Sequence, residues 1–226
     1  MAAGVHGARL SASGGSERSG GVRSALLAAA ALLAALAVVW VLAELVPVVR
    51  TGDARLLAHA VSLQGGRLEA ASKRLLSTLE APYVLLWGAA VVAVALSRGL
   101  PRLALAAAAV MILAPASADL LKPMLAHAHE RAGGAYVGAA SWPSGHAAAS
   151  MALVCGLAIA VPRKALGWVI ALGALYVVAV AVALLILAWH MPSDVLGGWL
   201  LAGLWTALAV AALRYARLKR PERRAW

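Results

Sequence analysis

The sequence predicts an all-α integral membrane protein with six transmembrane helices. Of its 226 residues, 63% are hydrophobic and only 13% are charged. A soluble domain of this size would be about 45–50% apolar and about 25% charged. The apolar residues also gather in six long segments that follow one another almost without pause. We therefore expect one membrane domain, residues 24–213, between an N-terminal tail and a basic C-terminal tail.

The N-terminal tail, residues 1–23, is rich in Gly, Ser and Ala with scattered Arg, which favours a disordered segment. The first apolar segment, 24–48, exceeds the ~7–15 residues of a signal-peptide core, so we interpret it as an anchor. The remaining five segments are 81–97, 103–121, 145–161, 165–189 and 195–213. A helical span needs about 20 residues, so the second and fourth segments are short.

The connection between the first two segments, residues 50–80, predicts an amphipathic helix that lies on the outer leaflet. Apolar residues recur there at helical spacing: Leu68, Ala71, Leu75 and Leu79. Glu69 and Lys73 are four residues apart, so they can form an ion pair on a helix surface. An ordinary exposed loop helix is the alternative interpretation.

Basic residues predict which side of the membrane each connection occupies. Most of the 20 Lys and Arg residues fall in four regions: the N-terminal tail, 98–102, 163–164 and 214–226. These regions share one side of a six-span protein, and cytoplasmic loops carry an excess of Lys and Arg. Both termini are therefore expected in the cytoplasm of a multi-pass cell-membrane protein. This placement explains the net charge of +11 by topology and anionic lipid headgroups, and we expect no nucleic-acid partner.

A histidine and an aspartate near the last apolar segment form the sharper of two candidate motifs, His190-Met191-Pro192-Ser193-Asp194. Pro192 suits the first position of a helix, so His190 should precede that helix and Asp194 should lie in its first turn. A neutral histidine is a competent nucleophile toward phosphorus, and a carboxylate on one ring nitrogen fixes its tautomer. The alternative is an interfacial histidine beside a helix-start aspartate.

The other motif, Pro143-Ser144-Gly145-His146, opens the fourth apolar segment. Ser144 suits an N-cap, and the free amides of the first turn form an anion site that Gly145 leaves open to a phosphate. His146 could protonate a leaving oxygen as a general acid. A capped helix with a polar interfacial histidine is the alternative.

Further polar residues follow the third apolar segment. Lys122 could supply a cation to a phosphate, although it could also snorkel to the interface or pair with Asp119. His127 and His129, with Glu130, could hold a metal, but no further ligand clusters with them. We therefore expect no metal and no cofactor. If the spans alternate from a cytoplasmic N-terminus, Lys122, His146 and His190 all reach the outer face.

Together these motifs resemble those of the type 2 phosphatidic acid phosphatase superfamily, which includes lipid phosphate phosphatases and vanadium haloperoxidases. The family pattern is Lys-x6-Arg-Pro, Pro-Ser-Gly-His and Ser-Arg-x5-His-x3-Asp, and the resemblance covers about residues 103–213. It implies that His190 is the nucleophile that forms a phosphohistidine, that Asp194 orients it, and that His146 protonates the leaving group. It further implies that the phosphate is held by Lys122, Ser144 and Gly145.

Two arginines of the family pattern are missing or displaced in this sequence. Ala183 and Leu184 stand where the third motif has Ser and Arg. His129 stands where the first motif has Arg, and Arg131 follows two residues later. We include His129 and Arg131 among the candidate phosphate-binding residues.

These observations predict a metal-independent lipid phosphatase whose partners are the bilayer and a lipid phosphate. The candidate substrates are a polyprenyl diphosphate, phosphatidic acid and phosphatidylglycerol phosphate. One alternative is a catalytically degenerate family member that binds or carries an anionic lipid. Another is an intramembrane serine hydrolase using Ser144 with His190, but Ser144 lacks the surrounding signature of a nucleophile elbow.

Overall fold

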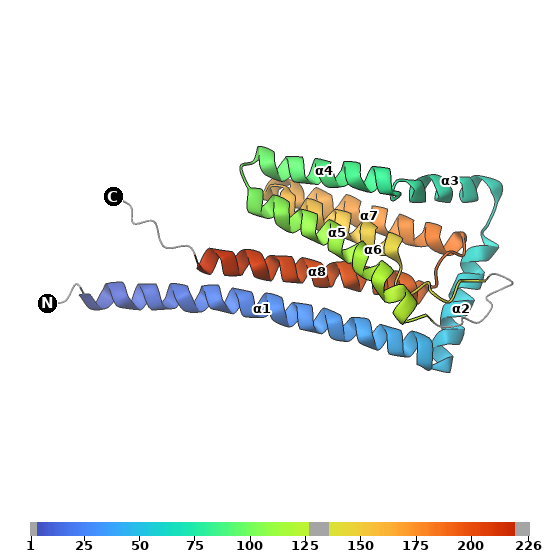
Figure 1. Ribbon diagram of the computed structural model, residues 1–226, viewed down its shortest axis with the longest axis horizontal. Coiled ribbons are helices and arrows are strands. Elements are labelled where there is room, and N and C mark those ends of the chain that lie inside the picture. Colours follow the sequence, from blue (N-terminus) through green and yellow to red (C-terminus); the bar gives the residue numbers. More distant parts are fainter. Residues whose placement is uncertain (1–3, 127–135, 220–226) are drawn as a thin grey trace.

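A computed structural model shows the chain as a bundle of α-helices (Figure 1). It describes residues 4–126 and 136–219, and of residues 4–18 it describes the backbone alone. The helices in these ranges are α1 (Gly4–Leu45), α2 (Pro47–Ser62), α3 (Gly66–Ser77), α4 (Ala81–Ser97), α5 (Pro101–Met124), α6 (Gly145–Ala160), α7 (Arg163–Ile186) and α8 (Pro192–Leu218).

Several of these helices are long and apolar enough to cross a membrane. Within the described ranges four pass this test, namely residues Ser19–Leu45 of α1, and α5, α7 and α8. A fifth is obtained if α3 and α4, which meet at a bend of 54°, form one broken span. Helix α6 is apolar but has only 16 residues. The chain is therefore a multi-pass, all-helical protein, and the expected number of six spans stays a prediction.

The N-terminal segment differs from the sequence-based expectation. Helix α1 begins at Gly4, so the backbone of residues 4–23 is helical where composition favoured a disordered tail. At its other end α1 stops at Leu45, because Pro47 begins a new helix. The domain boundaries expected at residues 23 and 213 stay predictions.

The connection at residues 50–80 forms parts of two helices rather than the expected single one. Gly65 has an extended backbone and is the N-cap of α3. Residues 63–65 therefore separate α2 from α3. The expected ion pair is present, with Lys73 Nζ 2.6 Å from a Glu69 oxygen. The expected apolar face is partly wrong: Leu68 is exposed, whereas Leu76 is buried. Leu76 packs against α7, and this contact selects the buried face of α3.

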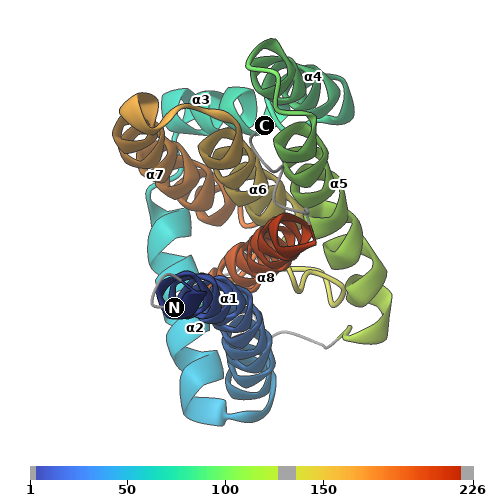
Figure 2. The same cartoon turned by 90° about the vertical axis from the view of Figure 1, so that its left-hand side faces the viewer.

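Helix α8 lies at the centre of the bundle, where it contacts α1, α5 and α6 (Figure 2). Leu201 of α8 packs in one cluster with Leu36 of α1 and Ala118 of α5. Ala202 packs in another cluster with Ala114 of α5 and Ala152 of α6. Small residues at these contacts let helix backbones approach closely, as is common among membrane helices.

Two arginine hydrogen bonds join chain segments at one end of the bundle. Both termini lie at one end, and α2 crosses the opposite end (Figure 1). At the end with the termini, Arg98 donates to the Ala160 carbonyl, and Arg214 donates to the Gly21 carbonyl at 2.6 Å. Basic connections therefore lie at the end with the termini.

The crossing of α6 and α8 depends on a missing side chain. A Cβ atom placed on Gly198 would lie 2.5 Å from the Ser144 carbonyl oxygen and 2.8 Å from the Ala148 nitrogen. Both neighbours are backbone atoms, which cannot move aside cheaply. Gly198 therefore sets how closely the start of α6 approaches α8.

Replacing this glycine is expected to destabilise the bundle. Gly198→Ala should lower the apparent melting temperature in detergent by roughly 2–10 °C, because overpacking typically costs about 1–3 kcal/mol. The matched control is Gly167→Ala on α7, where an added Cβ would meet nothing within 4 Å. Equal melting temperatures for the two variants would contradict this account of the crossing.

Candidate active site

The C-terminal turn of α7 sets the direction in which the chain reaches His190. Ala188 has a φ of 52°, in the left-handed region. Its amide donates to the Leu185 carbonyl at 3.0 Å, and the Trp189 amide donates to the Leu184 carbonyl at 3.0 Å. This is a Schellman pattern with alanine at a position that glycine usually occupies. It ends α7 and turns the chain toward α8.

One carboxylate oxygen of Asp194 organises the next turn. Asp194 Oδ2 accepts a hydrogen bond from the Met191 amide at 2.8 Å and lies 3.3 Å from His190 Nδ1. The Asp194 side chain is fully buried, and that of His190 is 10% exposed. Pro192 begins α8, so His190 precedes the helix and Asp194 lies in its first turn, as the sequence predicts. A proton on Nδ1 would leave the lone pair of the other ring nitrogen, Nε2, for nucleophilic attack.

The second motif is bonded directly to the first. The Ser144 amide donates to the Asp194 carbonyl at 2.9 Å. Ser144 is also the N-cap of α6, as predicted, because its hydroxyl oxygen accepts from the Ala147 amide at 3.2 Å. The start of α6, with its free amides, therefore lies beside the His190–Asp194 turn.

An ion pair from α5 lies against this start of α6. Lys122 Nζ is 2.8 Å from Asp119 Oδ1. A Cβ atom on Gly145 would lie 3.4 Å from that nitrogen and 3.3 Å from that oxygen. Lys122 thus brings a cation to the amides that could bind a phosphate. Asp119 pairs with it and would compete with an incoming anion.

His146 faces the same group of charged and titratable side chains. It interacts electrostatically with His190, Lys122 and Asp119. Its ring centre lies 5.7 Å from that of Trp189, and the two rings are inclined by 55°. A second histidine beside the first allows one to act on phosphorus while the other transfers a proton.

The structure describes one of the two positions at which this sequence departs from the arginines of the family pattern. Leu184 is fully buried in an apolar cluster with Leu76 and Val180, so the position of one family arginine is part of the hydrophobic core. His129 and Arg131 lie outside the described residues, as do His127 and Glu130, which were weighed as metal ligands.

Asp53 also contacts the His190–Asp194 turn, although it belongs to neither sequence motif. Its carboxylate accepts hydrogen bonds from the backbone amide of Ser193 at 3.1 Å and from the Ser193 hydroxyl at 2.6 Å. A carboxylate is favourable at a helix N-terminus, but sequence alone does not show which helix receives it. The two residues are 140 positions apart.

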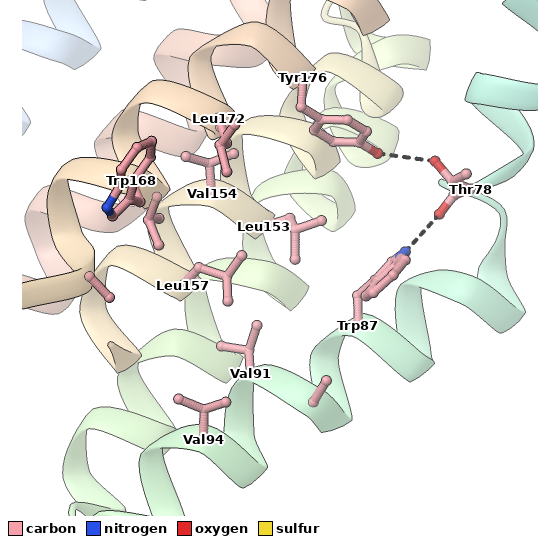
Figure 3. Close-up of a pocket in the computed structure, with 14 residues that line it drawn as sticks. Thr78, Trp87, Val91, Val94, Leu153, Val154, Leu157, Trp168, Leu172 and Tyr176 are labelled. Atoms are coloured by element: carbon pink, nitrogen blue, oxygen red, sulfur yellow. Dashed lines mark hydrogen bonds between the residues drawn. The ribbon is translucent and has the colours of Figure 1, made fainter. Parts of the chain in front are cut away.

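An apolar pocket of about 550 Å³ lies between α4, α6 and α7 (Figure 3). At one edge Tyr176 and Thr78 join their hydroxyl groups at 3.1 Å, and the Trp87 indole donates to the Thr78 carbonyl at 3.3 Å. No predicted site residue is among those that line it. The pocket is therefore separate from the histidine site.

Comparison with known proteins assigns the family. The sequence pattern of the PAP2 superfamily matches residues 89–218, which hold both histidine motifs. The chain belongs to the PAP2 superfamily. No curated protein sequence matches the chain.

A solved structure of similar fold comes from the same superfamily. It is the crystal structure of the first transmembrane PAP2-type phosphatidylglycerolphosphate phosphatase from Bacillus subtilis. The match has a TM-score of 0.59 at 19% sequence identity, and it covers 86% of this chain and 98% of the other. It shows that the PAP2 protein shares the fold of that membrane protein.

The pairing of Asp119 with Lys122 gives a prediction about anion binding. Asp119→Asn should raise the affinity for orthovanadate, a phosphate analogue, about two- to fivefold, because an exposed ion pair is worth only about 0.2–1 kcal/mol. Titration of purified protein measures this change. Glu69→Gln, which breaks the ion pair with Lys73 on α3, is the control. Weaker vanadate binding in Asp119→Asn would show instead that the carboxylate is needed to place Lys122.

Proposed function

We propose that this PAP2 protein is a lipid phosphatase that releases phosphate from a membrane lipid through a phosphohistidine on His190. The observation that carries the proposal is the bond between the two motifs. Asp194 contacts His190 through its side chain and Ser144 through its carbonyl, so nucleophile and anion site are held together. A nucleophile oriented by a second group beside an anion site is the arrangement that phosphoryl transfer requires.

In the first step the lipid phosphate binds at the amides that begin α6, with Lys122 on one of its oxygens. His190 Nε2 attacks phosphorus, a P–N bond forms, and the P–O bond to the lipid breaks. Protonated His146 gives its proton to the leaving oxygen. Asp194 stabilises the positive charge that develops on the His190 ring.

In the second step water attacks the phosphohistidine. His146, now neutral, takes a proton from that water, the P–N bond breaks, and inorganic phosphate leaves. His190 supplies the nucleophile and His146 supplies the acid and the base, and we expect no metal or cofactor. Phosphatidylglycerol phosphate is the first substrate to test, because a PAP2 protein of similar fold is a phosphatase for it. Phosphatidic acid and polyprenyl diphosphates are the other candidates.

The site is proposed to face the outer side of the membrane. Six spans are proposed, formed by α1, α4, α5, α6, α7 and α8, with both termini in the cytoplasm. The basic connections at the end with the termini support this orientation, because Lys and Arg concentrate in cytoplasmic loops.

This orientation is tested by labelling single cysteines in sealed right-side-out membrane vesicles. The background is Cys155→Ala, which removes the natural cysteine. A membrane-impermeant maleimide should label Gly66→Cys at once, because Gly66 is exposed at the start of α3, which follows α2 in the chain. Lys164→Cys, exposed in the first turn of α7, should be labelled only after detergent is added. The reverse order would place the site on the cytoplasmic side.

A degenerate family member that binds an anionic lipid is the second candidate. It is favoured by Leu184, because an apolar core residue replaces a phosphate-binding arginine of the family. A serine hydrolase using Ser144 is disfavoured. The Ser144 side chain is buried, and its hydroxyl oxygen already accepts the Ala147 amide.

Phosphate release by detergent-purified protein tests the proposed function. The assay contains EDTA and offers the three candidate lipid classes. His190→Ala should lose at least about a thousandfold in rate, because removal of a covalent nucleophile abolishes the main path. His59→Ala, an exposed histidine of α2, is the matched control and should keep full activity.

Two results would count against this function. Full activity in His190→Ala would exclude the phosphohistidine route. Folded wild-type protein that binds the lipids but releases no phosphate from any of them would favour the degenerate lipid binder.

A further inference from the structure

Helix α2 places a carboxylate against Ser193, which lies in the chain between the two residues of the proposed catalytic pair. Asp53 Oδ1 lies 3.1 Å from the Ser193 nitrogen, and Asp53 Oδ2 lies 2.6 Å from the Ser193 hydroxyl. Ser193 is buried and lies in the chain between His190 and Asp194. A single side chain from a distant helix therefore holds both the backbone and the side chain of this turn.

The same helix also packs its apolar face against the turn. Ala54 and Leu57 of α2 are buried in one cluster with Met191, the residue that follows His190. Helix α2 crosses the end of the bundle at which α7 ends and α8 begins (Figure 1). Apolar and polar contacts from α2 thus converge on the same five residues, 190–194.

We propose that Asp53 is a positioning residue for the phosphatase reaction, a role that rests on the function proposed above. Its two bonds to Ser193 fix the first turn of α8. Asp194 follows Ser193 directly and holds the Met191 amide and the His190 ring. A shift of Ser193 therefore moves the carboxylate that orients the nucleophile.

The position of Ser193 in α8 makes this contact favourable. Ser193 is the second residue of α8, so its amide has no partner within the helix and lies at the positive end of the helix dipole. A carboxylate satisfies this amide and meets a favourable field. Asp53 lies outside residues 89–218, so the family pattern does not contain it.

Substitutions of Asp53 separate geometry from charge. Asn keeps an oxygen that accepts from the Ser193 amide and gains an amide that can donate to the Ser193 hydroxyl, whereas Ala loses both contacts. With a lipid phosphate as substrate, Asp53→Ala should lower kcat by roughly 10- to 100-fold, because small misplacements of reacting groups are costly. KM should stay within about twofold, since the Asp53 bonds described above are made to Ser193, in the turn that orients the nucleophile. Asp53→Asn should keep most of the activity.

Controls on the same elements distinguish positioning from a general effect on folding. Arg55→Ala changes an exposed residue of α2 and should leave kcat unchanged. Ser193→Ala removes the hydroxyl contact but keeps the amide contact, so its kcat should fall between those of wild type and Asp53→Ala. A kcat of Asp53→Ala equal to that of Arg55→Ala would overturn the proposal.

A second readout does not depend on turnover. Diethyl pyrocarbonate modifies accessible histidines, and mass spectrometry reports each site separately. His190 is buried, so Asp53→Ala should increase its modification rate severalfold relative to wild type, with exposed His59 unchanged as an internal reference. Asp53→Asn should match wild type.

The two readouts separate failure of this inference from failure of the proposed function. Wild-type protein without phosphatase activity would reject the proposed function. A selective rise in the modification rate of His190 in Asp53→Ala would still support the inference that Asp53 positions the turn. An unchanged His190 rate would overturn the inference even in an active enzyme. An equal rise at every histidine would also overturn it, because it would indicate general loosening of the fold.

Discussion

The buried carboxylate of Asp194 is the constraint on which the site depends. A buried charge is costly unless it is paired or hydrogen bonded, so the surroundings of Asp194 must be arranged around it. Its Oδ2 joins the Met191 amide and the His190 ring, and its backbone carbonyl receives the Ser144 amide. Within the described ranges Oδ1 has no hydrogen-bond partner, so Oδ2 carries the contacts of this side chain. Removal of this side chain would leave the Met191 amide and the His190 ring without their common partner.

The proposed phosphate site has one lysine among its described residues, and that lysine is paired with a carboxylate. A core leucine replaces one family arginine, so binding would depend more on the free amides of α6 and on Lys122. Asp119 moderates that lysine by pairing with it. Under the proposed function this balance would favour product release, because strong cationic binding of phosphate slows turnover. Helix α2 contributes to the site through the bonds of Asp53 to Ser193.

Local interactions could be predicted from the sequence, and distant ones could not. The helix start at Pro192, the Ser144 cap and the Glu69–Lys73 pair each depend on residues at most four positions apart. By contrast, Asp53 meets Ser193 only because α2 folds across the far end of the bundle. The need for Gly198 arises in the same way, since the backbone that it admits belongs to another helix. The buried face of α3 was misjudged because packing against α7, rather than hydropathy alone, selects it.

Identification of the phosphorylated residue tests the central claim most directly. Purified protein is mixed with a lipid labelled with ³²P in its terminal phosphate, quenched in alkali within milliseconds to seconds, and digested for peptide mapping. A phosphohistidine is stable in alkali and labile in acid. The account predicts label with this stability on His190, formed at least as fast as phosphate is released, and absent from His190→Ala. Phosphate release without any labelled protein, or label on Ser144, would contradict it.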